Sequence, residues 1–245
     1  MSGPPLEPAR LGAPLIRLGE TASTNDIGRL LAGARVPEGA VVVADRQTRG
    51  RGRLGRVWLS PHGGLWCSVL LRPEAQAPPG LLSLAVGVAV AEALEELAGV
   101  PLGLKWPNDV VVDRGKLSGI LLESAGRAMV AGIAVNLLPV CLPEMEGRRA
   151  ASLLEIAGRP FSRDDVLAAV LERLGPWYDA WRAGGAEVVS AWRRRDASAG
   201  QVLGVSLPDG VVEGTALPID DDGALRLQLR SGEVRRVLAG EITAL

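Results

Sequence analysis

The chain has 245 residues, of which 47% are hydrophobic and 22% are charged, and its formal net charge is −1. A disordered chain is less apolar than this, and a protein that coats nucleic acid by bulk charge is more basic, so the composition excludes both classes. The longest strongly apolar stretch, Leu81–Ala91, is too short to cross a membrane, and neither a secretory leader nor a disulfide framework is visible, so we expect a cytoplasmic protein.

The first hundred residues predict a loose arm followed by alternating helices and strands. Residues 1–14 carry four prolines and no periodic pattern, which indicates the arm. Ser23 or Thr24 is a suitable N-cap for the first helix. The remaining expected elements are a helix over Thr24–Ala34, a buried strand over Ala40–Ala44, a loop over Arg46–Val57, a strand over Leu65–Leu71 and a buried helix over Leu81–Ala98.

Strands and then helices follow in the middle of the chain. The expected strands, joined by hairpin turns at Asp113–Gly115 and Gly126, are Leu102–Trp106, Val110–Val112, Leu117–Glu123 and Met129–Leu137. Ser162 is expected to cap a helix, which Gly175 and Pro176 bend or break before further helix runs to about Arg195.

Beyond Ala199 the pattern changes to short alternating segments separated by turns. The four expected strands are Val202–Leu207, Val211–Pro218, Ala224–Leu229 and Val234–Leu238. The fold class is therefore α+β: a mixed or antiparallel sheet with helices packed on one side, in residues 1–198, followed by a small β-barrel in residues 199–245.

Two basic motifs suggest chemistry with an anionic ligand. The Arg-Gly loop, which we define as Arg49–Val57, offers glycines for close backbone approach and arginines for carboxylate or phosphate. Only two of the 27 basic residues are lysines, and both, Lys105 and Lys116, lie within a 12-residue span around Asn108 and Asp109. Ammonium groups stabilise phosphate charge, and one carboxylate suits Mg²⁺. A solvated basic loop and a charged hairpin remain the structural alternatives.

Two further segments place neutral polar groups where the chain is otherwise apolar. Ser23, Thr24 and Asn25 precede a helix, and Asn136 stands in the apolar run Gly132–Leu137. A buried asparagine must be hydrogen-bonded to the protein or to a ligand.

Taken together, these motifs resemble those of the biotin–protein ligases, in both order and spacing. The resemblance rests on Ser23-Thr24-Asn25, Gln47 with Gly50–Trp58, Lys105–Asp109, Lys116–Leu121 and Gly132–Leu137. It implies a class II synthetase-like catalytic domain and a C-terminal SH3-like barrel. Only about 20 residues precede the Ser-Thr-Asn motif, so we expect no DNA-binding winged helix and no binding of DNA.

The resemblance also implies a two-step reaction. The biotin carboxylate attacks the α-phosphate of MgATP to form biotinyl-5′-AMP, and a lysine of a biotin carboxyl carrier protein then displaces AMP. Biotin and MgATP are substrates, and no tightly bound prosthetic group is expected. No membrane partner is expected, while an exposed sheet edge would allow a homodimer.

By similarity, the site residues fall into overlapping groups. The catalytic residues are Lys116, Arg53, Lys105 and Asp109, the last as a Mg²⁺ ligand. The biotin-binding residues are Ser23, Thr24, Asn25, Gln47, Gly50, Arg51, Gly52, Arg53, Lys116 and Gly119. The nucleotide-binding residues are Arg53, Arg56, Trp58, Asn108, Lys116 and Asn136.

Three rival functions stay open at this point. A lipoate–protein ligase shares the acyl-adenylate chemistry, although the Arg-Gly loop and the barrel favour biotin. Octanoyl transfer needs a reactive cysteine, and neither Cys67 nor Cys141 has a marked partner. A nucleic-acid-binding protein is disfavoured by the net charge of −1 and by the scarcity of aromatic residues.

Overall fold

The computed structural model describes residues 11–34, 36–73, 78–113, 115–140, 149–207 and 210–243. Its elements in the first part of the chain are β1 (Leu15–Thr21), α1 (Thr24–Gly33), β2 (Val41–Gln47), β3 (Leu65–Leu71), α2 (Pro79–Ala98), β4 (Gly103–Lys105), β5 (Asp109–Val112), β6 (Gly115–Ala125) and β7 (Ala128–Val135). Those that follow are β8 (Arg149–Ala150), α3 (Leu153–Ala157), α4 (Arg163–Arg182), α5 (Ala186–Arg195), β9 (Val202–Leu207), β10 (Gly210–Leu217), β11 (Leu225–Gln228), β12 (Val234–Val237) and β13 (Glu241–Thr243).

The main sheet is mixed, which is one of the two arrangements that the sequence left open. Its strand order is β1-β2-β3-β7-β6-β5-β4, with β8 pairing to β6. The β1–β2 and β6–β8 pairs are parallel, and the other neighbours are antiparallel. The hairpin expected at Gly126 is confirmed, because this residue joins β6 to β7 with a φ of 66° that glycine adopts readily.

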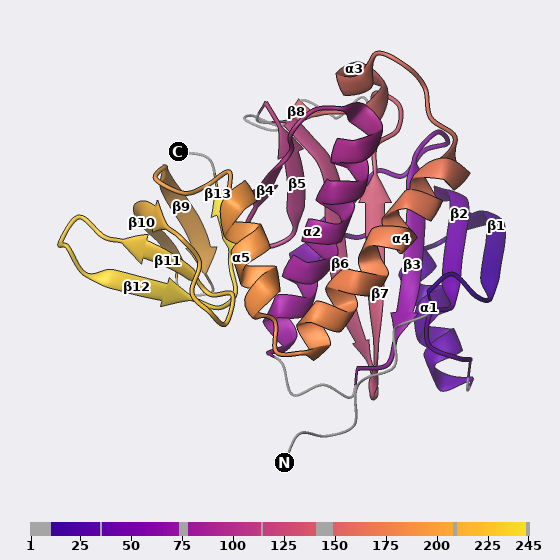
Figure 1. Cartoon of the computed structure of the whole chain (residues 1–245), viewed down its shortest axis with the longest axis horizontal. Coiled ribbons are helices and arrows are strands. Elements are labelled where there is room, and N and C mark those ends of the chain that lie inside the picture. Colours follow the sequence, from indigo (N-terminus) through magenta and orange to yellow (C-terminus); the bar gives the residue numbers. More distant parts are fainter. Residues whose placement is uncertain are drawn as a thin grey trace.

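Helices α2, α4 and α5 form a layer on one face of this sheet (Figure 1). Alternate residues of β3, including Leu65, Val69 and Leu71, are buried in the core beneath that layer. Helix α2 is apolar nearly all round because it lies between the sheet and α4. It ends at Gly99, whose left-handed conformation (φ 72°) closes its last turn.

Helix α1 lies on the opposite face, so the expectation that all helices pack on one side is wrong. Leu70 of β3 and Val130 of β7 form a separate small core there, packed against Leu31 of α1. The approach is close, because a Cβ added at Gly28 would lie 2.6 Å from Val130. The sequence did not reveal this because one short amphipathic helix fits either face of a sheet that is buried on both sides.

The C-terminal strands form a second sheet, with the order β12-β11-β10-β9-β13 (Figure 1). Among the described residues no ladder joins β12 to β13, so these five strands form an open sheet rather than a closed barrel. The indole Nε1 of Trp106 donates to the carbonyl of Gly223 at 3.0 Å, and Arg193 of α5 donates to the carbonyl of Ile219 at 2.7 Å. These bonds join the second sheet to the rest of the molecule.

Several elements differ from the sequence expectation. The short elements β1, β8, α3 and β13 were not predicted, since runs of two to seven residues carry little periodicity. Helix α4 continues through Pro176, because the buried residues Leu174, Tyr178 and Trp181 hold it against the core on both sides of the proline. The Ser162 cap is confirmed, since its hydroxyl accepts a hydrogen bond from the Asp165 N–H at 3.0 Å.

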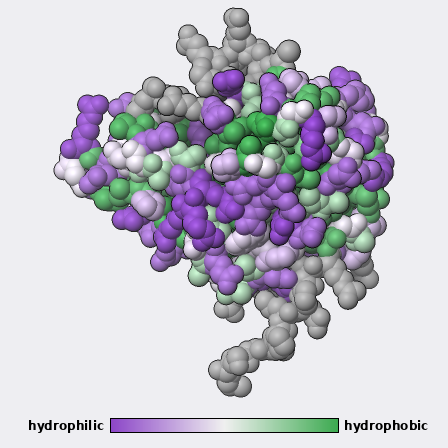
Figure 2. Space-filling view, turned by 45° about the horizontal axis from the view of Figure 1, so that its top comes forward, coloured by the Kyte–Doolittle hydropathy of each residue, from purple (hydrophilic) through white to green (hydrophobic). Residues whose placement is uncertain are grey.

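Hydrophilic and hydrophobic side chains are both present on the surface of the protein. In the view of Figure 2, hydrophilic side chains cover much of the surface and hydrophobic ones form smaller patches between them. Within the described ranges, no helix is long and apolar enough to cross a membrane. Residues 1–10 of the expected arm over 1–14, the Pro208–Asp209 part of a turn, Arg114 and Cys141 all lie outside the described residues.

Candidate functional site

One cavity of about 540 Å³ lies where α1, the Arg-Gly loop, β6, β7 and the edge of the second sheet meet. Every site residue predicted from the sequence lines it except Gly50. The cavity therefore brings together predicted residues that are separated by up to 113 positions in the chain, from Ser23 to Asn136. Its two ends differ in chemistry: one is neutral and polar, and the other carries positive charge.

The neutral end is a hydrogen-bonded group around the start of α1. Gln47 Oε1 accepts hydrogen bonds from the backbone N–H of Thr24 at 2.8 Å and from its hydroxyl at 3.2 Å. The hydroxyl of Ser68 donates to Asn25 Oδ1 at 2.6 Å and lies 2.7 Å from the hydroxyl of Thr24. Ser23 is the N-cap residue but makes no capping side-chain bond, so the helix does not use its hydroxyl.

Asn25 holds this group against the floor of the cavity. Its Nδ2 donates to the carbonyl of Leu121 at 3.2 Å and to Glu123 Oε2 at 2.7 Å. A Cβ added at Gly132 would lie 2.4 Å from Asn25 Oδ1, so only glycine leaves room for the asparagine here. The polar end is therefore built before any ligand arrives, because the buried groups named here are bonded to one another.

Gly50 lies behind the cavity wall rather than on its surface. A Cβ added there would lie 2.4 Å from the carbonyl oxygen of Trp58 and 2.6 Å from Ser60 Oγ. Ser60 Oγ in turn accepts a hydrogen bond from Gln47 Nε2 at 2.8 Å. Gly50 thus permits the close approach of the chain that keeps Gln47 in place.

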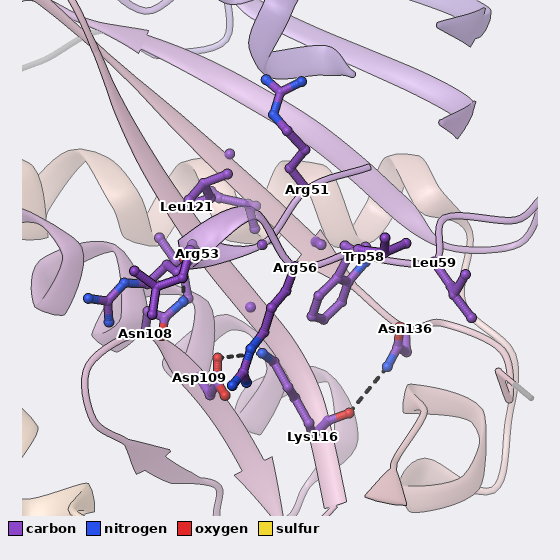
Figure 3. A pocket seen from close by; sticks show the side chains of 18 of the residues that line it. Arg51, Arg53, Arg56, Trp58, Leu59, Asn108, Asp109, Lys116, Leu121 and Asn136 are labelled. Carbon is purple, nitrogen blue, oxygen red and sulfur yellow. Dashed lines mark hydrogen bonds and ion pairs between the residues drawn. The ribbon is translucent and has the colours of Figure 1, made fainter. Parts of the chain in front are cut away.

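The charged end is centred on Lys116 (Figure 3). Its Nζ lies 2.6 Å from Asp109 Oδ1 and 4.8 Å from the centroid of the Trp58 ring. A Cβ added at Gly119 would lie 2.8 Å from Trp58 and 3.1 Å from Lys116 Cε, so both side chains lie over this glycine. The buried Nε1 of Trp58 has no hydrogen-bond partner among the described residues.

A β-bulge directs Lys116 into the cavity. In the β5–β6 ladder Asp109 lies opposite Gly119 and Val110 opposite Ser118, but Val111 lies opposite Lys116. This shift breaks the alternation of β6, so that Leu117 and Ile120 are both buried in the core. Lys105 lies opposite Asp109 across the β4–β5 ladder and also lines the cavity.

Arg53 and Arg56 bring further positive charge from the Arg-Gly loop. Burial lowers the pKa of Arg53, and the nearby Asp109 carboxylate partly opposes that shift. Arg56 forms an ion pair with Glu241 of β13, so the second sheet contributes directly to the cavity. Leu54, at the tip of the loop, has a positive φ of 55° and leaves 75% of its surface exposed.

Arg51 lines the cavity, but its guanidinium turns away from the charged end (Figure 3). It makes a two-pronged contact with Asp26, at 2.6 and 3.1 Å, and lies 3.4 Å from Glu123 Oε2. The hydrogen bond from Arg51 holds the pKa of Asp26 below its ordinary value.

Two residues that are predicted to bind the nucleotide form hydrogen bonds with backbone carbonyls in or beside the main sheet. Asn108 Nδ2 donates to the carbonyl of Ile120 at 2.7 Å. Asn136 Nδ2 donates to the carbonyls of Lys116 at 3.2 Å and Ala151 at 3.1 Å. Asn136 therefore holds the strand that carries Lys116, whatever else its amide oxygen does (Figure 3).

The acidic residues and the cysteine near the cavity limit which chemistry the protein can supply there. The part of the chain that the structure describes holds no group of three or more His, Cys, Asp or Glu that would cage a metal ion. Asp109 and Glu241 are the acidic residues that line the cavity. Burial raises the pKa of the Cys67 thiol to about 12, so this cysteine is not a nucleophile at neutral pH.

Sequence reasoning missed Ser68, Glu123 and Glu241. Ser68 is a polar residue in the middle of an apolar strand, which is the same signal that identified Asn136. Glu123 ends a predicted strand and has no local signature. Glu241 belongs to a three-residue strand, so only the tertiary fold places it at the cavity.

A slot with a neutral polar end and a cationic end fits an enzyme that joins a small polar acid to a phosphate group. Comparison with known proteins agrees. Residues 20–139 match the Biotin/lipoate A/B protein ligase family, and residues 201–243 match the Biotin protein ligase C terminal domain. The chain belongs to the biotin/lipoate A/B protein ligase family.

The relatives described here are named as ligases. The chain is 35% identical to the biotin–[acetyl-CoA-carboxylase] ligase of Mycobacterium tuberculosis, over 99% of this chain and 97% of the relative. It is 35% identical to the bifunctional ligase/repressor BirA of Bacillus subtilis, over 95% of this chain and 74% of the relative. The biotin protein ligase of Aquifex aeolicus in complex with biotin and ATP superposes with a TM-score of 0.83 at 35% identity, covering 94% of this chain and 97% of that chain.

Proposed function

We propose that this chain is an ATP-dependent biotin–protein ligase. In the first step an oxygen of the biotin carboxylate attacks the α-phosphorus of ATP, the bond to the β-phosphate breaks, and biotinyl-5′-AMP and pyrophosphate form. In the second step the amine of a lysine on a biotin carboxyl carrier protein attacks the acyl carbon and AMP leaves. The product is an amide between biotin and the carrier.

The observation that carries this proposal is the single cavity with two unlike ends. A bicyclic ureido group needs neutral donors and acceptors in a dry slot, which Ser23, Thr24 and Gln47 supply. A carboxylate and a triphosphate need cations, which Arg53, Arg56 and Lys116 supply at the other end. The similarity to ligases that carry biotin in their names supports the choice of substrate.

The residue roles follow from these positions. Lys116 would stabilise the charge that develops on the transferring phosphate, and Arg53 would hold the acyl phosphate. Trp58, Asn108 and Asn136 would border the nucleotide, and Gly52 and Gly119 would leave room for the ligand. No enzyme base is required in the first step, because a carboxylate is already a nucleophile.

Mg²⁺ fits this site with few protein ligands. It keeps several waters and substrate phosphates in its shell, so one carboxylate is an adequate protein contribution. Asp109 would supply that contribution, although Lys116 occupies one of its oxygens in the free protein. When bound, the ion would neutralise phosphate charge, and Lys105 and Lys116 would do the same from their side chains.

We further propose that residues 1–198 form the catalytic domain and residues 199–245 an SH3-like domain, in the cytoplasm where ATP and the carrier protein are available. The separate strand order of the second sheet supports this division. The homodimer and the lack of DNA binding stay predictions.

The experiment is a pyrophosphate-release assay with mass spectrometry for biotinyl-AMP. Release is expected only when biotin and MgATP are both present, and added nucleic acid is expected to have no effect. A carrier domain added afterwards should gain the mass of biotin on one lysine. If lipoate replaces biotin with equal efficiency, the lipoate ligase alternative is correct instead.

A further inference from the structure

The Arg51 latch, by which we mean Arg51 with Asp26 and Glu123, joins the Arg-Gly loop to both α1 and β6. Arg51 Nη2 lies 2.6 Å from Asp26 Oδ1 and 3.4 Å from Glu123 Oε2. The side chains of Arg51 and Glu123 are 32% and 24% exposed, so the contacts are partly shielded from solvent. A two-pronged arginine–carboxylate contact fixes orientation as well as distance.

Besides the latch, the loop is held near its C-terminal end by the Arg56–Glu241 ion pair, and it has little apolar packing between these two points. Leu54 and Val57 leave 75% and 79% of their surfaces exposed and pack against little. Within the loop, the N–H of Gly52 donates to the carbonyl of Arg56 at 2.7 Å, and the N–H of Trp58 donates to that of Gly50 at 2.9 Å. These bonds shape the loop, but they do not tie its middle to the rest of the protein.

Glu123 connects the latch to the neutral end of the cavity. The same oxygen, Oε2, accepts from Arg51 and from Asn25 Nδ2, at 3.4 and 2.7 Å. Asn25 in turn accepts from Ser68 in the network around Thr24. The loop and the polar end therefore share one carboxylate.

We propose that Asp26 and Glu123 are positioning residues, which hold the Arg-Gly loop through Arg51 so that Arg53 and Arg56 face the charged end of the cavity. Arg51 then acts as an anchor of the loop and not as a ligand of the acyl carboxylate. The inference rests on the proposed function for its effect on the reaction, but the latch itself is a property of the ligand-free protein.

The first test is hydrogen exchange on the ligand-free protein, read on peptides covering Arg49–Trp58. Asp26→Asn is expected to speed exchange of the Gly52 and Trp58 amides by about 2- to 5-fold, the range for losing a partly exposed ion pair. The matched control is Glu20→Gln, which removes a carboxylate from the Arg46–Glu20 ion pair (2.7 Å) away from the cavity. An unchanged exchange rate in Asp26→Asn, or an equal change in the control, would overturn the proposal that the Arg51 latch holds the loop.

The second test is a double-mutant cycle on the rate of adenylate formation at low ATP. Arg51→Met and Asp26→Asn are each expected to lower this rate by about 5-fold, and the double variant no further, because the two residues act as one unit. The KM for ATP should rise while biotin affinity and the rate at saturating ATP change little. Substituting a residue that is needed only for stability would instead lower the melting temperature without raising the KM for ATP selectively.

A direct ligand role for Arg51 gives a different pattern. Asp26→Asn leaves the guanidinium in place and frees it, so this variant would keep or improve its activity while Arg51→Met lost activity. That result overturns the proposal, as do additive losses or two unaffected single variants. Glu123→Gln keeps an acceptor for Asn25 but removes the charge, and it provides the same test if Asp26→Asn folds poorly. If the wild-type protein forms no biotinyl-AMP, the proposed function is wrong. The hydrogen-exchange experiment still tests whether Asp26 holds the loop through Arg51.

Discussion

The two ends of the cavity are built by different means. At the neutral end Ser23, Thr24 and Asn25 are almost fully buried, and the side chains of Thr24 and Asn25 are held by hydrogen bonds to Gln47, Ser68 and a backbone carbonyl. At the charged end the side chains of Lys116 and Arg56 are 36% and 39% exposed and form ion pairs with the carboxylates of Asp109 and Glu241, respectively.

This difference indicates different energetics of binding. Folding has already fixed the neutral end, so a ligand there meets preorganised partners and pays little reorganisation cost. At the charged end the protein supplies its own carboxylates as temporary partners, and an incoming phosphate must replace or join them. Substitutions should therefore act on affinity at the first end and on rate and nucleotide use at the second.

The largest effect is expected at Lys116. Lys116→Met should lower the single-turnover rate of biotinyl-AMP formation by about 10²-fold or more, as removal of one preorganised electrostatic donor does elsewhere. Lys116→Arg should rescue poorly, because a planar guanidinium does not fit where the ammonium lies over Gly119 and beside Trp58.

A melting curve separates this role from a structural one. The Lys116–Asp109 pair is partly exposed, so its loss should cost no more than about 1 kcal/mol of unfolding free energy. Near-normal turnover in Lys116→Met would make Lys116 a surface residue of β6 and remove the main reason for regarding the two lysines as catalytic.

The next largest effect is expected on biotin binding when the neutral end of the cavity is changed. Gly132→Ala places a methyl group 2.4 Å from Asn25 Oδ1, so it should displace Asn25 and weaken biotin binding by about 10-fold or more, the result of ~1–3 kcal/mol of overpacking. Calorimetric titration with biotin measures the change. Gly33→Ala, also a glycine replacement and at the end of α1 with nothing within 4 Å, is the control and should bind biotin normally. Equal affinities in both variants would show that Asn25 does not shape the biotin end.

The sequence predicted which residues lie together better than it predicted the hydrogen bonds and ion pairs between them. Short motifs with unusual polar or basic residues, such as Ser23–Asn25 and Lys105–Asp109, were found because they stand out from their surroundings. The predicted residues of these motifs line the cavity except Gly50, although only some of them lie on strands. The partners of those residues were not predictable from the motifs, and the structure pairs Lys116 with Asp109.

Two physical causes explain why the other features of the site could not be predicted from the sequence. The bulge in β6 changes the face on which Lys116 lies, and alternation of apolar residues does not reveal a bulge. Helix α1 and strand β13 reach the site by tertiary packing, which no local pattern encodes. Glu241 was missed for this reason, although it bonds to one of the predicted arginines.

Glu241→Gln should have a moderate effect confined to the charged end. Without the Glu241 charge Arg56 is oriented less well towards the cavity, so the KM for ATP should rise by about 5-fold, near 1 kcal/mol, while the affinity for biotin stays the same. Arg193→Ala is the control, because it removes a hydrogen bond between α5 and the carbonyl of Ile219 without touching the cavity. If both variants change only the melting temperature, the second sheet acts through docking and not through Arg56.

The smallest expected effect is the pH dependence of the Asp26 contact. Its hydrogen bond to Arg51 places the pKa of Asp26 below the ordinary value of 3.8, so the folded protein binds this proton less readily than the unfolded chain. The resulting stabilisation is present above pH 3.8 and is lost as the pH falls through the folded-state pKa. Asp26 is 38% exposed, so the contribution should not exceed about 1 kcal/mol. Urea unfolding of wild type and Asp26→Asn should show a gap at pH 6 that narrows as the pH is lowered towards about 3. A gap that is independent of pH would mean that the substitution acts through α1 and not through the charge on Asp26.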